Sequence, residues 1–306
     1  MRAVRSLTTL GAAFAIGLAV SACSDGNSAT PSEEVAGPDP LMGAVHGGKG
    51  GKGGKDGDGW LHPGLLHGFK RVVDLTQTLD ENTPVIILPP PFANSPGLTR
   101  DVISFFDAAG PDWAWYTLHF GEHTGTHFDA PCHWATGRDL ACLDEVPPEH
   151  LIGPAVVIDV RDKVARNPDY LVTVEDAKAW ERRHGRIPAG AWVILQTGWS
   201  KRYNDPAAYL NDGHTPGPSK ELSEFLTFER DVRGIGVETV GTDAGMAGTF
   251  DPPFPNHNIL LGAGKYGLTS LTNVDKLPPR GAVLIVAPMK LRGGTGSPVR
   301  VLALVP

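Results

Sequence analysis

Positive charge is scarce in this sequence, which has 27 Lys and Arg residues against 34 Asp and Glu residues. A nucleic-acid-binding protein normally gathers basic residues on one surface, so this balance argues against DNA or RNA as a partner. Lysines are interspersed with glycines over residues 47–59, but this segment has no apolar face to bury and predicts a flexible tether. It lacks the Gly-Lys-Ser/Thr ending that a phosphate-binding loop requires.

Long apolar runs are equally rare. The run over residues 7–20 follows Arg2 and Arg5, and it is too short for a standard membrane span but typical of a secretory signal. The small residues before Cys23 resemble a bacterial lipobox, in which the cysteine is lipidated; cleavage near Ala22 without a lipid is the alternative. We therefore predict a lipoprotein signal peptide over residues 1–23 and a flexible Gly/Lys-rich linker over residues 24–59. The protein would be exported and lipid-anchored to the cell envelope, facing the periplasm or the exterior.

The sequence has only three cysteines, and lipidation would account for Cys23. Cys132 and Cys142 then remain in a compartment that permits disulfides. Both a bridge between them and two free thiols are open at this point. A nucleophilic Cys132 is less favoured, because its neighbours already supply a chemistry.

Residues 60–306 are long enough for one domain of ordinary core size. Buried or alternating apolar runs predict strands, and capping signals at Thr173 and Ser219 predict helices that end near Gly185 and Arg230. The expected strands cover residues 71–75, 102–106, 115–118, 155–160, 192–195, 235–240, 282–287 and 299–305. Strands interleaved with helices indicate an α/β domain.

The segment that carries the chemistry is residues 123–133, HTGTHFDAPCH. Alternate side chains of an extended chain point the same way, so His123, His127, Asp129 and His133 would share one face. A kink at Gly125 would bring His123 to the others. Two imidazoles and a carboxylate suit a divalent ion such as zinc, manganese or iron, with a position left for water. A polar loop whose histidines only satisfy hydrogen bonds is the competing interpretation.

Four other features carry weaker predictions. His257 is a candidate for the site, and Asn256 would cap the short helix that it begins. Asp243 lies among glycines, which favours a turn role. The aromatic residues 113–116 would belong to the core rather than to a substrate pocket, and His119 would be packed or face solvent rather than bind the ion.

Residues 123–133 match the pattern His-x-Gly-Thr-His-x-Asp-x-Pro-x-His without a gap. In this the chain resembles the metal-dependent cyclase-like hydrolases, a family that includes bacterial kynurenine formamidases and isatin hydrolases. Weaker similarities extend the resemblance over roughly residues 70–305. The resemblance implies a swivelling β/β/α domain with a mixed sheet and flanking helices, a homodimer or homotetramer, and hydrolysis of an amide or cyclic amide.

The resemblance also assigns roles to individual residues. It implies that His123, His127 and Asp129 bind the metal, that His133 is the catalytic acid or base, and that a metal-activated water attacks the carbonyl. His257 would complete the site. Thr269 stands where kynurenine formamidases have a glutamate for a second ion, and a hydroxyl is a poor substitute.

We therefore expect one divalent ion, Mn²⁺ or Zn²⁺, with a small amide or lactam as substrate and the membrane reached only through the lipid. Residues 86–92 replace a tryptophan-bearing segment of the formamidases, which argues against a kynurenine substrate. Two alternatives remain open. One is a non-haem iron oxygenase that uses His127, Asp129 and His257, and the other is a tethered metal- or solute-binding lipoprotein without turnover.

Overall fold

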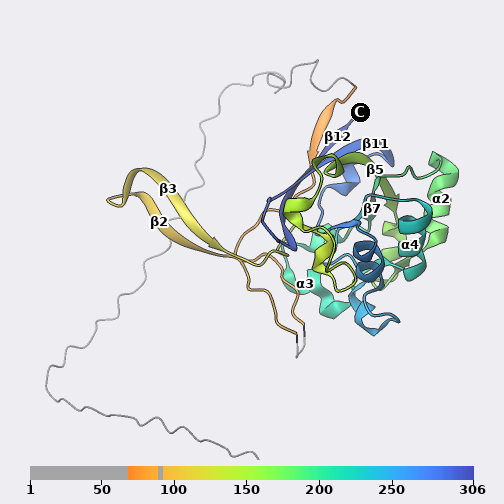
Figure 1. Cartoon of the computed structure of the whole chain (residues 1–306), viewed down its shortest axis with the longest axis horizontal. Coiled ribbons are helices and arrows are strands. Elements are labelled where there is room, and N and C mark those ends of the chain that lie inside the picture. The colour runs from red at the N-terminus through yellow and green to blue at the C-terminus, as the bar shows by residue number, and fades with distance from the viewer. Residues whose placement is uncertain (1–67, 89–91) are drawn as a thin grey trace, which may run out of the picture. The chain divides into compact units, whose positions relative to one another are not determined.

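The computed structural model describes residues 68–88 and 92–306 of the chain (Figure 1). The predicted signal peptide and linker lie outside the described residues. No helix in the described part of the chain is long and apolar enough to cross a membrane. The strands are β1 (Arg71–Asp74), β2 (Thr99–Asp107), β3 (Gly110–His119), β4 (His127–Asp129), β5 (Ile152–Asp159), β6 (Leu171–Val172), β7 (Trp192–Gln196), β8 (Gly217–Pro218), β9 (Gly234–Val237), β10 (Tyr266–Leu268), β11 (Arg280–Pro288) and β12 (Gly296–Val305).

The centre of the domain is an 8-stranded mixed sheet with the order β1-β12-β11-β5-β7-β9-β10-β4. Strands β5, β7, β9 and β10 run parallel, whereas β11, β12 and β1 are antiparallel to their neighbours. The short strand β4 pairs with β10 on one side and with β12 on the other. This double pairing closes the sheet on itself and fixes β4, the middle of the HTGTHFDAPCH segment, between two neighbours.

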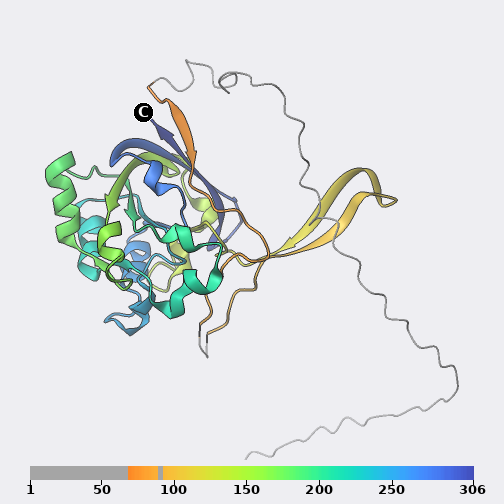
Figure 2. The ribbon, with the colours of Figure 1, turned by 180° about the vertical axis from the view of Figure 1, so that it is seen from behind.

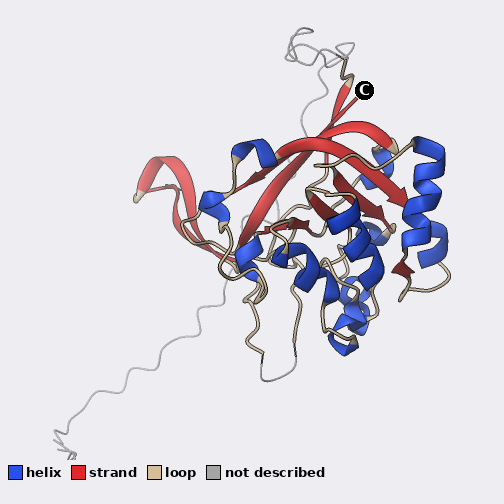
Figure 3. Cartoon of the chain, turned by 45° about the vertical axis from the view of Figure 1, so that its right-hand side comes forward, coloured by secondary structure: helices blue, strands red, loops and turns tan. Residues whose placement is uncertain are grey.

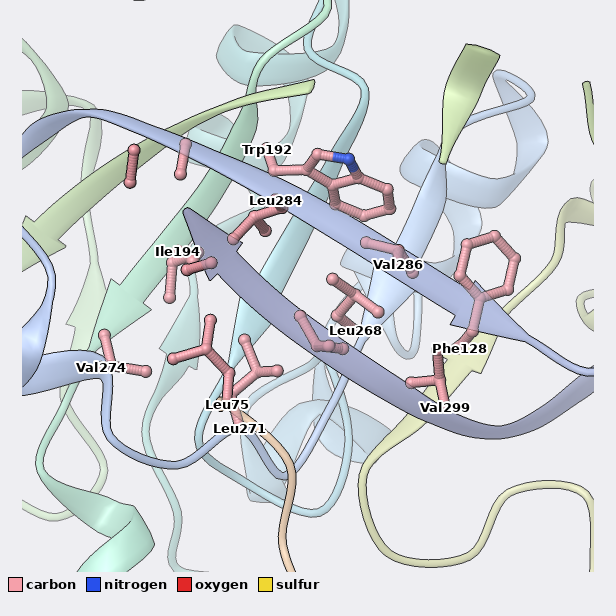
Figure 4. Packing of buried hydrophobic residues seen from close by; sticks show 14 of the residues in the cluster. Leu75, Phe128, Trp192, Ile194, Leu268, Leu271, Val274, Leu284, Val286 and Val299 are labelled. Carbon is pink, nitrogen blue, oxygen red and sulfur yellow. The ribbon is translucent and has the colours of Figure 1, made fainter. Parts of the chain in front are cut away.

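The two faces of the sheet carry two hydrophobic clusters. The first contains Phe128, Trp192, Leu268 and Leu284, and Figure 4 shows these side chains between the curled strands. The second contains alternate residues of the same strands, such as Val193, and it includes side chains from the helices. Figure 2 and Figure 3 show the helices that contribute to this second cluster gathered on one side of the sheet. The mixed sheet with flanking helices confirms the predicted fold class.

The helices are α1 (Arg161–Val164), α2 (Val174–His184), α3 (Pro206–Leu210) and α4 (Lys220–Glu224), which continues as the π-helical turn η7 (Phe225–Glu229). Helix α2 begins and ends as predicted: Thr173 and Asp176 form a capping box, and Gly185 follows with a φ of 84°. Ser219 caps α4 as predicted, accepting a hydrogen bond from the backbone N–H of Leu222. The strand predicted over residues 235–240 is shorter, since β9 ends at Val237.

The prediction that the aromatic residues 113–116 belong to the core is wrong. They lie on β3, which in the described part of the chain pairs only with β2, in a two-stranded hairpin. Trp113 and Trp115 are 50% and 55% exposed, and Phe106 on the loop side of β2 is 64% exposed. Ser104 is the only buried residue of β2. An isolated hairpin with this much exposed apolar surface is marginally stable in water, so the pattern points to a surface that another molecule covers.

Candidate metal centre

Strand β4 places two of the predicted ligands side by side. Phe128 points into the core and is fully buried, so His127 and Asp129, its neighbours, face the opposite side of the strand. Asp129 lies opposite Gly267 of β10 and opposite Gly296 of β12. A Cβ on Gly267 would lie 2.6 Å from Asp129 Oδ2, and one on Gly296 would overlap the His123 ring. Glycine on both flanking strands therefore leaves room for the acidic side chain and its neighbouring imidazole.

His127 is held in one tautomer by the backbone. Gly125 adopts a φ of 63°, the kink predicted from the sequence, and its carbonyl accepts a hydrogen bond from His127 Nδ1 at 2.8 Å. A carbonyl can only accept, so Nδ1 carries the proton and Nε2 keeps its lone pair. Thr269 Oγ1 also lies beside this ring, 2.8 Å from Nδ1. Orientation of an imidazole by a backbone carbonyl is characteristic of metal-binding histidines.

His123 is oriented by a chain of polar side chains. Thr295 donates its hydroxyl proton to Glu122 Oε2 at 2.6 Å, so its oxygen accepts from His123 Nε2 at 3.1 Å. The other ring nitrogen, Nδ1, then presents a lone pair to Asp129 Oδ1 only 2.9 Å away. Two acceptors at this distance need a proton or a cation between them.

Asp129 is the centre of the cluster. It is 1% exposed, and its Oδ2 atom has no hydrogen-bond partner among the described residues. Burial alone raises the pKa of Asp129, but the attraction of the neighbouring His127 and His123 imidazoles outweighs burial and holds that pKa well below its usual range. A buried carboxylate with an unpaired oxygen is destabilising unless a cation compensates it.

His133 enters the cluster from the 3-10 turn η2 (Pro131–His133) rather than from a continued strand. Its ring centroid is 3.9 Å from that of His123. Burial lowers the pKa of His133 to about 3, since the nearby histidines add to burial and outweigh the opposing charge of Asp129. The imidazole is therefore neutral at neutral pH. Cys132, the residue before it, forms a disulfide with Cys142, which resolves the alternative left open by the sequence.

The donor set fits a divalent ion. His123, Asp129 and His133 each offer one ligand atom, and these atoms all lie within 4.8 Å of one another. His127 Nε2 is 3.4 Å from Asp129 Oδ1, so it borders the same carboxylate. Neutral imidazole nitrogens with one carboxylate are the ligands that zinc and manganese sites use. This group of three residues differs from the predicted ligands, because it contains His133, predicted as the acid or base, and does not contain His127.

His257 also reaches the cluster, but Asn256 does not cap its turn as predicted. His257 begins the π-helical turn η9 (His257–Leu261), and Asn256 has helical φ and ψ with no side-chain capping bond. Asp243 takes that role instead: its carboxylate accepts from the backbone N–H groups of Asn256 and His257. The centroid of the His257 ring lies 4.6 Å from that of the Trp134 ring, with the two rings tilted, and 5.8 Å from that of His133.

Three contributors to the site were not predicted from the sequence. Glu122 and Thr295 orient His123, and Asp243 contacts His257. Glu122 adjoins the motif, which could have drawn attention to it. Thr295 lies 172 residues from His123, and no local pattern marks it. Asp243 was assigned a turn role because glycines surround it in the sequence.

Comparison with known proteins identifies the family of this chain. Residues 73–244 match the Cyclase family model, described as "Putative cyclase". The chain belongs to the cyclase family. An isatin hydrolase of Roseibium aggregatum is 49% identical over 249 residues, which cover 79% of this chain and 94% of the relative. A kynurenine formamidase of Salinibacter ruber is 30% identical over 186 residues, which cover 60% of this chain and 76% of the relative.

A solved structure supports the same placement within the cyclase family. The crystal structure of an isatin hydrolase bound to the product analogue thioisatinate matches this chain with a TM-score of 0.76 at 48% sequence identity. The match covers 79% of this chain and 95% of the other. The predicted family resemblance is therefore confirmed over most of the domain.

Proposed function

We propose that this cyclase-family chain is a metal-dependent hydrolase that opens a cyclic amide of the isatin type. The observation that carries the proposal is the buried Asp129 carboxylate. Its Oδ1 atom lies beside nitrogens of His123 and His127, and its Oδ2 atom has no hydrogen-bond partner among the described residues. The similarity to isatin hydrolases at 49% identity supports the choice of a carbon–nitrogen bond in a ring. It favours this substrate over the formylkynurenine type, because the formamidase relative is only 30% identical.

The cluster supports one ion, which we propose to be manganese or zinc. Thr269 is fully buried against His127, and the family resemblance implies that it replaces the glutamate with which formamidases hold a second ion. His123, His127 and Asp129 would hold the ion. A divalent ion bound there would supply Lewis-acid chemistry, which polarises a carbonyl and makes a water molecule more acidic.

The side chains around these ligands would perform the remaining steps. His133 is neutral at neutral pH, so its imidazole can accept a proton from water and pass it to the leaving nitrogen. Trp134 packs against Phe254 and His257, and this aromatic wall would shield the reacting bond from bulk water. The backbone carbonyl of Gly125 and the hydroxyl of Thr295 keep the two ligand histidines in the tautomers that the chemistry needs.

Turnover assays test this proposal directly. The chain, freed of metal by a chelator and reloaded with Mn²⁺ or Zn²⁺, should hydrolyse isatin or a related lactam and should leave formylkynurenine largely untouched. The chelated chain should be inactive. Tight binding of a lactam with no product would instead support a binding lipoprotein, and ferrous-iron-dependent oxygen consumption would support an oxygenase.

We infer that the β2–β3 hairpin joins a second copy of this chain in the predicted dimer or tetramer. Replacing Phe106 and Trp115 together with Ser removes two of its most exposed apolar side chains. We expect the mass measured by light scattering to fall to that of a monomer. Phe228→Ser is the matched control, because this phenyl ring is 66% exposed outside the hairpin. An unchanged mass in the hairpin variant would contradict the assignment.

We also propose, from residues 1–59 alone, that the protein is exported and anchored by a lipid on Cys23. Incorporation of a labelled fatty acid in a bacterial host, lost in Cys23→Ala, is the measurement that decides it.

A further inference from the structure

Asp243 lies in the loop after β9 and has an environment unlike that of a turn residue. It is 6% exposed, and both of its carboxylate oxygens are used. Oδ1 accepts from the backbone N–H of Asn256 at 2.8 Å, and Oδ2 accepts from the backbone N–H of His257 at 3.0 Å. Oδ2 also lies 2.5 Å from His257 Nδ1. One side chain therefore fixes both the backbone and the ring of His257.

These contacts determine which nitrogen of His257 is available. An ionised carboxylate only accepts hydrogen bonds, so His257 Nδ1 must carry a proton and donate it to Asp243. Nε2 is left as the nitrogen that can contact another molecule. Trp134 packs against the ring with a tilt of 36° and 4.6 Å between ring centroids, which hinders rotation of the imidazole. His133, the proposed acid or base, is the neighbouring imidazole at 5.8 Å between ring centroids.

We infer that Asp243 is a positioning residue that fixes the tautomer and orientation of His257, so that Nε2 contacts the amide being cleaved beside His133. The inference rests on the proposed function, because it assigns His257 to the same substrate. The arrangement resembles in principle the carboxylate–imidazole pairs of hydrolases, in which the carboxylate sets the tautomer without itself taking up a proton. It differs from the metal ligands, whose orientation comes from Gly125 and Thr295.

The variant Asp243→Asn tests whether Asp243 positions His257 or only supports the fold. The amide oxygen can still accept a backbone N–H, but an amide NH₂ facing Nδ1 would require that nitrogen to accept, which moves the ring proton to Nε2. We expect kcat on the lactam to fall by about 10²-fold with little change in KM, a size typical of a lost acid–base or orienting group. The content of zinc per chain should remain that of the wild type.

Two controls sharpen the test. Asp169→Asn disrupts a matched pair on the surface, where Asp169 Oδ2 lies 2.9 Å from His214 Nδ1, and it should leave kcat unchanged. In a His257→Ala background, Asp243→Asn should cause no further loss of kcat, because the imidazole that it positions is gone. If Asp243→Asn lowers kcat as much in the His257→Ala background as in the wild type, the inference is overturned.

A spectroscopic measurement tests the contact without relying on turnover. In the zinc-loaded full-length chain labelled with ¹⁵N-histidine, the His257 signals, identified by their loss in His257→Ala, should show a protonated Nδ1. In Asp243→Asn they should show the proton moved to Nε2. Identical His257 signals in the two proteins would refute the positioning role. If the wild type hydrolyses no cyclic amide, the proposed function fails, while these signals still decide whether Asp243 holds His257.

Discussion

Replacing Asp129 with Asn should reduce the ion content of the chain from one per chain to nearly none and abolish hydrolysis. The carboxylate is 1% exposed and borders two imidazoles, so its charge is the main electrostatic attraction for a cation at this position. An amide keeps the shape of the side chain but loses that charge. Elemental analysis after loading with manganese and, separately, with zinc measures the effect.

Thermal unfolding gives an independent measure of the same variant. An ion present at 100 times its Kd stabilises the native state by about 2.7 kcal/mol, and this gain should be absent in Asp129→Asn. Asp139→Asn is the matched control, since its side chain is 90% exposed. Full ion content in Asp129→Asn would refute the proposed centre.

Replacing His133 with Ala should leave the ion in place and lower kcat by roughly 10²–10⁴-fold, the range typical of a lost general acid or base. The expectation rests on the position of the His133 imidazole, whose ring centroid lies 3.9 Å from that of His123 and 5.8 Å from that of His257. Ion content and kcat should be measured on the same preparation. His184→Ala, on helix α2, controls for the loss of an imidazole elsewhere.

The structure makes this variant decisive, because His133 is close enough to the other ligand atoms to bind the ion itself. A parallel loss of ion and turnover would show that His133 is a ligand. His127, which borders Asp129 at 3.4 Å, would then be the residue to test as proton carrier. Retained ion with retained turnover would remove His133 from the mechanism.

The strands and the long helix could be predicted because their signals are local. Strands such as β7, buried over its whole length, appear in the sequence as continuous apolar runs. Helix α2 carries its own start and stop signals in Thr173 and Gly185. The hairpin shows the limit of such patterns: Trp113 and Trp115 have the composition of a core strand, but no other part of the described chain pairs with that hairpin. Whether an apolar strand is covered depends on its neighbours in space.

The sequence by itself determined which residues are the candidate donors, because His123, His127, Asp129 and His133 fall within one short segment. Strand alternation accounts for His127 and Asp129 and a glycine kink for His123, whereas His133 reaches the cluster from a 3-10 turn. The tertiary structure decided how these donors are held. The glycine that gives Asp129 its space lies on β10, the one that gives the His123 ring its space lies on β12, and the hydroxyl that orients His123 is 172 residues away. Only folding brings such distant residues together, because strand pairing, and not sequence spacing, sets their register.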